Sequence, residues 1–378
     1  MTPVEADITC RLATGQTIDE IAEQRSSKSR TIRGYLKAIF VKTGVSRQAD
    51  LISLVLNAPL QVTDAKKIVM QYGKDGLVKL PEKNISYREY GPKNGRPMVL
   101  CHASLSCRYG VPLHLPLLEK YQIRLIVPER GGVGLSNGAP YQKITDFAAD
   151  FRALVEHLQL KKVDVIGVVA GGAYALSAAW LCSDIVNRVL LLEGFAPNIA
   201  EHTIKGAPGY FRMMPRLIRY FPKVSERLMS FQLRDFANDW QKALQHTSKL
   251  FNPFDAQILL REDVRDFALI EAIENNRQGV SALIRDILLV HADWQIPLED
   301  IKSPCYIAYG NADPVAACYA ETLIQRLPNT RQVFREDEGF ARMLYLSFFE
   351  IIEQAGWVEV KSENLPAEKV GDGNLYPA

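Results

Sequence analysis

A glycine-rich turn near the middle of the chain has the form of a catalytic turn but lacks a catalytic side chain. Residues 163–166 predict a buried strand, and the small residues from Gly171 onwards predict a helix. A sharp turn between such a strand and helix lifts its central side chain above the sheet, where a serine can act as a nucleophile. The glycines of the turn are Gly167, Gly171 and Gly172, but its central residue is Val169, which carries no nucleophile.

A carboxylate follows another predicted strand further along the chain. The apolar run at 305–309 predicts a strand that leads into a turn containing Asp313. A carboxylate placed there could orient a histidine for proton transfer. Residues 330–336 predict the last strand, and the residue after the following Gly339 is Phe340.

The order of these positions resembles that of the α/β-hydrolases, in which serine, acid and histidine follow one another along the chain. The resemblance spans about residues 75–358 and matches the triad to Val169, Asp313 and Phe340. All histidines precede Asp313, at His102, His114, His157, His202, His246 and His291. Loss of one triad member alone typically lowers turnover by several orders of magnitude, so we expect no catalytic residues and no enzyme activity.

The body of the chain predicts an α/β fold with a mainly parallel sheet. Strands alternate with helices over 85–358, after a linker and first edge strand at 61–84. A helical segment at about 197–280 interrupts the alternation and resembles the cap of α/β-hydrolases. Residues 359–378 predict a polar tail. Buried strands are expected at 98–102, 123–128 and 163–166, and further strands at 189–192, 305–309 and 330–336.

The apolar residues at Val169 and Phe340 suggest a receptor pocket, and we expect both to line one cavity. A loop N–H and the N–H after the turn would hold a ligand carbonyl, and flexible cap residues would close over it. The expected ligand-binding residues are His102, Ala103, Ser104, Val169, Ala170, Phe340, Tyr210 and Met214. Alternatively, His102 is a hydrogen-bond donor within the fold, and the cap residues only pack against the sheet.

The first sixty residues predict a compact bundle of helices. Thr2 and Thr17 each begin a helix through a capping box. A longer helix with an inward apolar stripe is expected from Ser27 to Lys42, Gly44 ends it, and Ser46 begins another.

Basic residues are concentrated in one part of this bundle. Residues 25–47 contain seven basic residues and no acid, whereas 1–24 contain one basic residue and five acids. Residues 61–378 are balanced at 37 basic and 37 acidic, so the net charge of +2 belongs to the first sixty residues. This pattern favours a specific nucleic-acid contact over a generally basic surface. Gly34 weakens an isolated helix by about 1 kcal/mol relative to alanine, which suggests that another molecule approaches closely there.

Residues 1–58 resemble the LuxR-type helix-turn-helix DNA-binding domain. The resemblance is carried by 21–23, 31–33 and 39–47, with departures at Arg25, Ser27, Gly34 and Tyr35. It implies an all-α domain at 1–60 that binds duplex DNA. The expected contacts are Lys28, Arg30, Thr31, Arg33, Gly34, Lys37 and Lys42. The alternative is a solvent-exposed basic helix on a docking domain.

The remaining features indicate a cytoplasmic protein. The six cysteines are scattered without a C-x-x-C pair, and neither a signal peptide nor an 18-residue apolar run is visible. The sequence indicates no cofactor, no metal site and no membrane partner.

These observations predict a DNA-binding transcriptional regulator. Its non-catalytic α/β-hydrolase-fold domain would sense a small, largely apolar effector, form a homodimer, or do both. One alternative is a DNA-tethered hydrolase with a displaced nucleophile at Ser104, Cys101 or Cys107. Another is a ligand-free oligomerisation scaffold.

Overall fold

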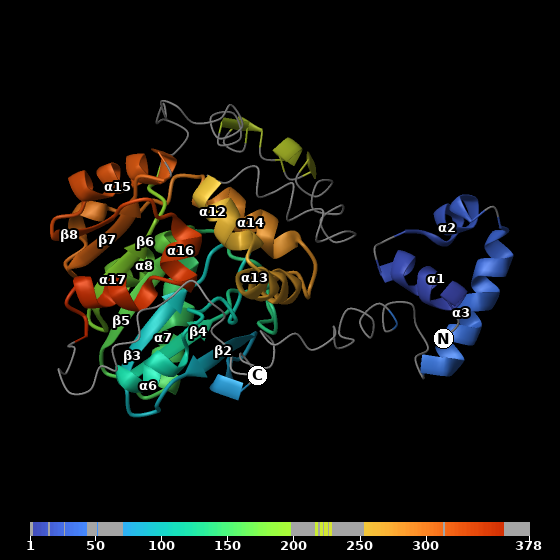
Figure 1. Ribbon diagram of the computed structural model, residues 1–378, viewed down its shortest axis with the longest axis horizontal. Coiled ribbons are helices and arrows are strands. Elements are labelled where there is room, and N and C mark those ends of the chain that lie inside the picture. The colour runs from blue at the N-terminus through green and yellow to red at the C-terminus, as the bar shows by residue number, and fades with distance from the viewer. Residues whose placement is uncertain are drawn as a thin grey trace.

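The computed structural model is shown in Figure 1. It describes residues 3–13, 16–25, 27–43, 51, 71–197, 216–217, 220–221, 223–225, 227–228, 253–312 and 314–358. Tyr210, Met214, Asp313, the helix expected from Ser46 and the tail at 359–378 lie outside these described residues.

The body is built on one eight-stranded sheet in the order β1-β2-β4-β3-β5-β6-β7-β8. Strand β2 pairs antiparallel with β1 and β4, and the other neighbours are parallel. The predicted mainly parallel sheet is therefore confirmed, with β1 as the expected edge strand. The strands are β1 (Gly73–Lys79), β2 (Asn84–Tyr90), β3 (Arg96–Cys101), β4 (Ile123–Pro128), β5 (Val163–Val168), β6 (Val186–Leu192), β7 (Cys305–Gly310) and β8 (Thr330–Arg335).

Helices cover both faces of this sheet and bury the central strands completely. Successive side chains of a strand point to opposite faces, so Val165 packs in one layer and Ile166 in the other. The layer of Val165 contains α7 (Phe147–His157), α8 (Gly171–Leu181) and α15 (Pro314–Arg326). The layer of Ile166 contains α6 (Pro116–Lys120), α16 (Phe340–Tyr345) and α17 (Phe348–Gln354).

A helical segment separates β6 from β7, as the sequence predicted. Its longer described helices are α12 (Pro253–Leu260), α13 (Glu262–Asn275) and α14 (Ser281–Val290), which lie next to one another in Figure 1. The segment therefore continues beyond the predicted end at 280. Gly279 adopts a φ of 96° in the turn before α14, so the break in the helical pattern marks a turn within the segment.

The N-terminal region folds into helices α1 (Pro3–Ala13), α2 (Ile18–Gln24) and α3 (Ser29–Thr43) around a small apolar core. The predicted capping box at Thr17 is present: its hydroxyl accepts from the N–H of Glu20 at 3.2 Å. Helix α3 begins two residues after the expected Ser27, where the Ser29 hydroxyl donates to Asp19. The core contains Ile8, Leu12, Ile21, Ala22, Ile32, Leu36, Ile39 and Leu51.

Candidate functional site

Val169 lies at the turn between β5 and α8 in a backbone conformation that valine rarely adopts. Its φ is 51°, and a β-branched residue in this left-handed region is strained by about 1–3 kcal/mol. The loop after β6 holds the turn, because the Val169 N–H donates to Leu192 at 2.9 Å and its carbonyl accepts from Phe195 at 3.2 Å. The turn thus has the geometry that presents a nucleophile, with a valine in the nucleophile's place.

The glycines around Val169 are required by close backbone packing. A Cβ atom added to Gly171 would lie 1.9 Å from the carbonyl oxygen of Cys101, at the end of β3. One added to Gly167 would lie 2.6 Å from the Cα of Gly172. Helix α8 therefore packs against the ends of β3 and β5 more closely than any side chain would allow.

The loop after β3 is fixed by a buried arginine. Arg130 donates from Nη1 to the carbonyl of His102 at 2.8 Å and from Nη2 to that of Ala103 at 3.2 Å. Among the described residues, no hydrogen bond is recorded from the N–H of Ala103 or of Ala170. These N–H groups are the expected carbonyl-binding donors, and neither has an acceptor within the part of the chain that the structure describes.

His102 serves the fold, in keeping with the alternative drawn from the sequence. Its Nδ1 lies 2.8 Å from the carbonyl oxygen of Ala103, so this nitrogen carries the proton and donates. Burial, aided by the charge of Arg130, holds the pKa of His102 well below its usual value. The Nε2 atom is buried with no partner among the described atoms. Burial therefore favours the neutral imidazole of His102.

Phe340 begins α16 at the position matched to the histidine. Asp255 of α12 accepts from the N–H of Ala341 at 2.9 Å, so a carboxylate caps this helix. A Cβ atom on Gly339 would lie 2.2 Å from Asp255 Oδ2. Phe340, Val169 and Ala103 are partly buried side chains that pack against the same apolar cluster.

Comparison with known proteins identifies the family of this domain. A family model described as the alpha/beta hydrolase fold matches residues 96–340. The chain belongs to the α/β-hydrolase fold family. No helix-turn-helix or LuxR-type domain is detected by the same comparison.

Relatives of this α/β-hydrolase-fold protein include enzymes. It is 23% identical over 300 residues to the proline iminopeptidase of Clostridium botulinum, covering 76% of this chain and 96% of that protein. A bromoperoxidase structure from Bacillus anthracis matches with a TM-score of 0.55 at 19% identity, over 75% of this chain and 98% of that one. The structure of an esterase from Exiguobacterium antarcticum matches with a TM-score of 0.54 at 17% identity, over 74% of this chain and 97% of that one. These structural likenesses show the fold alone.

The cysteines near the α/β-hydrolase turn are poor substitutes for a nucleophile. Burial raises the pKa of Cys101 to about 12. Burial also raises the pKa of Cys107 well above its usual value, and the nearby carboxylates of Glu129 and Glu271 reinforce the shift. Since the thiolate is the reactive form, burial disfavours the reactive form of both thiols.

Helices α12 to α14 each carry a buried acid that bonds another part of the domain, namely Asp255, Glu271 and Asp286. Asp255 caps α16, as described above. Glu271 of α13 accepts from the hydroxyls of Ser106 and Tyr345, and Asp286 of α14 pairs with Arg130 at 3.0 Å. From α13, Asn275 also donates to the carbonyls of Ser104 at 3.0 Å and Ser106 at 2.5 Å. Sequence reasoning missed these residues, although Arg130 lies just after the predicted strand at 123–128.

A second buried arginine joins three elements of the domain. Arg108 is 2% exposed, and its Nη1 lies 2.6 Å from Glu129 and 2.7 Å from Glu274 of α13. Its Nε lies 3.0 Å from Asp75 on β1. The guanidinium therefore bonds the edge strand, the loop after β4 and the cap helix α13 at once.

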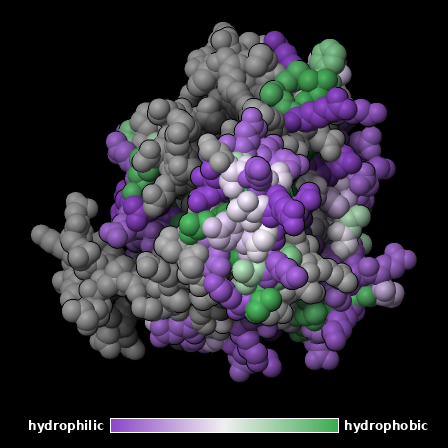
Figure 2. Space-filling view, turned by 90° about the vertical axis from the view of Figure 1, so that its right-hand side faces the viewer, coloured by the Kyte–Doolittle hydropathy of each residue, from purple (hydrophilic) through white to green (hydrophobic). Residues whose placement is uncertain are grey.

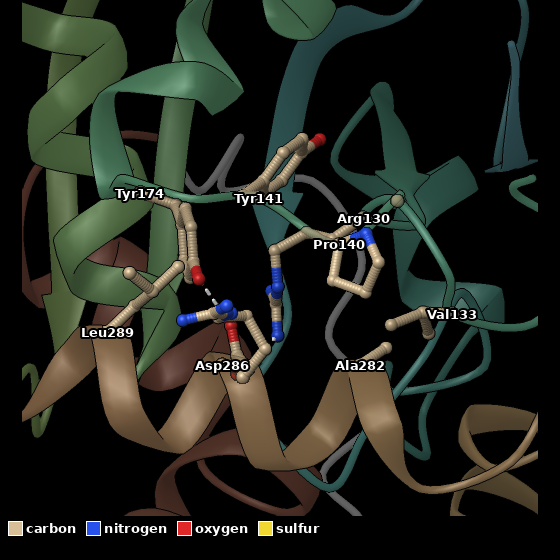
Figure 3. A pocket seen from close by; sticks show the side chains of 10 residues that line it. Arg130, Val133, Pro140, Tyr141, Tyr174, Ala282, Asp286 and Leu289 are labelled. Atoms are coloured by element: carbon tan, nitrogen blue, oxygen red, sulfur yellow. Dashed lines mark hydrogen bonds and ion pairs between the residues drawn. The ribbon is translucent and has the colours of Figure 1, made fainter. Parts of the chain in front are cut away.

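The pocket described in this domain is too small for an effector. It holds about 10 Å³, the space of about one water molecule. Figure 3 shows Arg130, Tyr174 and Asp286 at its wall, with Tyr141 and Ala282. Neither Val169 nor Phe340 lines this pocket, so it is not the cavity expected between them, and that cavity stays a prediction.

The N-terminal bundle exposes the basic side of α3. The apolar stripe faces its core, whereas the opposite side shows Lys28, Arg30, Thr31, Arg33, Gly34 and Lys37, all exposed. A Cβ atom on Gly34 would meet nothing within 4 Å. Lys42 differs from the others because its ammonium lies 2.7 Å from the buried carboxylate of Glu5. In Figure 2 the side of the molecule with the bundle is largely hydrophilic.

In the part of the chain that the structure describes, no helix has the length and hydropathy to cross a membrane. The same residues contain no group of His, Cys, Asp or Glu side chains arranged to hold a metal ion.

Proposed function

We propose that this protein is a DNA-binding transcriptional regulator with a non-catalytic α/β-hydrolase-fold domain. The N-terminal bundle binds duplex DNA through α3 as a LuxR-type domain would. The larger domain binds a small, largely apolar carbonyl compound and forms a homodimer. The protein acts in the cytoplasm.

The exposed basic stripe of α3 is the observation that carries this proposal. Arg30, Arg33 and Lys37 are exposed, and within the described residues none of them forms an ion pair. An unpaired row of cations beside an uncrowded Gly34 suits the phosphates and base edges of a major groove. Lys28 and Thr31 flank the row, whereas the pairing of Lys42 with Glu5 favours a role inside the bundle.

The DNA-binding part is tested with the triple variant Arg30→Ala, Arg33→Ala and Lys37→Ala. A duplex operator is first selected from a random library by the full-length protein, and affinity is measured by fluorescence anisotropy. We expect at least a hundredfold weaker binding, since each base or phosphate contact contributes about 1–3 kcal/mol. The control removes three exposed cations from the larger domain, with Lys93→Ala, Lys161→Ala and Lys162→Ala. Equal binding by the triple variant and the control would refute the proposal.

The receptor part is supported by the turn at Val169. The strained backbone is retained, the N–H groups of Ala103 and Ala170 have no acceptor among the described residues, and the centre of the turn is a valine. A carbonyl compound would bind there without being consumed. Val169→Trp would fill this space, and we expect it to abolish any effector-dependent change in DNA binding. An unchanged response in a folded variant would exclude the site.

A ligand-free scaffold is the second candidate, favoured by the small size of the described pocket. Native mass spectrometry of the purified protein separates the two, because a receptor retains or takes up a small molecule. A tethered hydrolase remains the third candidate. It would release product from 4-nitrophenyl esters in a way that Ser104→Ala abolishes.

A further inference from the structure

The peptide group between His102 and Ala103 has a hydrogen-bonded carbonyl and an N–H without an acceptor among the described residues. Its carbonyl accepts from Arg130 at 2.8 Å, whereas its N–H, on Ala103, has no acceptor among the described residues. A peptide group is planar, and its C=O and N–H point in opposite directions. The donor on the carbonyl therefore fixes the direction of the N–H. A cationic donor also polarises the group, which strengthens the N–H as a donor.

Arg130 is itself held from the cap by Asp286. The Arg130 Nη2 lies 3.0 Å from Asp286 Oδ2, and the two side chains are 3% and 5% exposed. Figure 3 shows both Arg130 and Tyr174 directed at Asp286 on α14. The Tyr174 hydroxyl donates to Asp286 Oδ1, and the Arg130 guanidinium lies 4.6 Å from the Tyr174 ring centre.

Tyr174 connects the same carboxylate to the second carbonyl-binding group. It lies on α8, one turn after Gly171, and α8 begins next to Ala170. Asp286 therefore contacts Arg130, which fixes the direction of the Ala103 N–H. It also contacts Tyr174, which lies on the helix that begins next to Ala170. Both donors are thus tied to one residue of α14.

We propose that Arg130 is a positioning residue for the carbonyl-binding peptide and that Asp286 couples this peptide to α14. The inference rests on the proposed receptor function, because it names how that site is regulated. Some ligands would bind the Ala103 N–H more tightly when the Arg130–Asp286 pair is intact. Such a ligand stabilises the conformation in which Asp286 holds α14 against Arg130. Such coupling is reciprocal, so displacement of α14 lowers ligand affinity by the same factor.

The first test needs no ligand. Hydrogen exchange of the full-length protein is followed by mass spectrometry in Asp286→Asn and in the control Asp300→Asn, an exposed acid outside α14. We expect amides of 102–110 to exchange at least tenfold faster in Asp286→Asn and at the wild-type rate in Asp300→Asn. If Asp286→Asn does not fold, Tyr174→Phe removes a single hydrogen bond to this carboxylate. Its expected effect is on the order of tenfold. Unchanged exchange in the folded variant overturns the coupling.

The second test separates positioning from simple support of the fold. The probe is acetophenone labelled with ¹³C at its carbonyl, and its infrared band is recorded with the wild type, Asp286→Asn and Asp286→Glu. We expect binding to shift the band to lower wavenumber, the asparagine variant to reduce the shift, and the glutamate variant to restore it in part. An equal shift in all three proteins overturns the positioning role. No shift in the wild type, with faster exchange in Asp286→Asn, refutes the receptor function and leaves the tie to α14 intact.

Discussion

Replacing Gly34 with alanine should stabilise α3 and weaken DNA binding at the same time. The added Cβ would meet no atom within 4 Å, so the methyl group creates no clash inside the protein. Alanine is favoured over glycine in a helix interior by about 1 kcal/mol. Within the protein alone, Gly34→Ala is therefore a stabilising change.

The opposite effect is expected when DNA is bound. If a base or sugar packs against the bare backbone at Gly34, a methyl group there overpacks a close interface. Overpacking a well-packed contact costs about 1–3 kcal/mol, which corresponds to roughly a 5- to 150-fold loss of affinity. The two effects have opposite signs, so they cannot arise from a change in helix stability alone.

The assay measures both quantities on the full-length protein. Hydrogen exchange of α3 amides reports helix stability, and fluorescence anisotropy with the selected operator reports affinity. Ala38→Gly, a half-buried position of the same helix, is the control because it lowers helix stability without adding an atom to the exposed side. Affinity in Gly34→Ala equal to or higher than in the wild type would refute close approach at Gly34.

Three further predictions follow from the buried groups. Burial raises the pKa of Glu271 to about 7, whereas an unfolded glutamate titrates near 4.3. The folded state thus binds the extra proton, and stability falls as pH rises from about 4.5 to 7. Urea titrations should show Glu271→Gln reducing this decline by about 3 kcal/mol. Lys42→Gln should lower the stability of the bundle by about 1–3 kcal/mol, measured by hydrogen exchange, because it removes the ion pair with the buried carboxylate of Glu5. Val169→Ser with Phe340→His should gain hydrolysis of 4-nitrophenyl acetate over buffer, and either change alone should not.

Each of these predictions has a result that contradicts it. The control is Glu262→Gln, at an exposed acid of the same helix, which should leave the pH dependence of stability unchanged. If Glu271→Gln also leaves it unchanged, the raised pKa of Glu271 is refuted. If Lys42→Gln leaves the stability of the bundle unchanged but reduces the salt dependence of DNA binding, Lys42 contacts a DNA phosphate and does not stabilise the bundle. For the double variant, turnover at the buffer rate would show that the turn no longer aligns a serine with its partners.

The sheet could be predicted from the sequence because its strands are short apolar runs between turns. Strand β4 was expected at 123–128 and lies there, and all of its residues are buried. The turn at Val169 was also predictable, since only glycines allow the close approach of Gly171 to Cys101. In contrast, the buried ion pairs were not. Arg130 and Asp286 are 156 positions apart, and no periodic pattern relates them.

The N-terminal bundle shows a different limit of sequence reasoning. The apolar stripe of α3 fixed which side is buried, because Ile32, Leu36 and Ile39 recur at helical spacing. The partner of a single polar residue has no such signal. Lys42 belongs by charge with the exposed cations, yet its ammonium bonds Glu5, 37 positions earlier.

The Arg108 cluster gives the protein a mechanical path from its cap to its first strand. Asp75 lies on β1, the strand that begins just after the segment linking the two domains, and Glu274 lies on α13. The planar guanidinium of Arg108 bonds both Asp75 and Glu274. A force on α13 is therefore transmitted to β1 directly through these ion pairs, without involving the hydrogen bonds of the sheet. A force applied between β1 and α13 would act directly on this charge cluster.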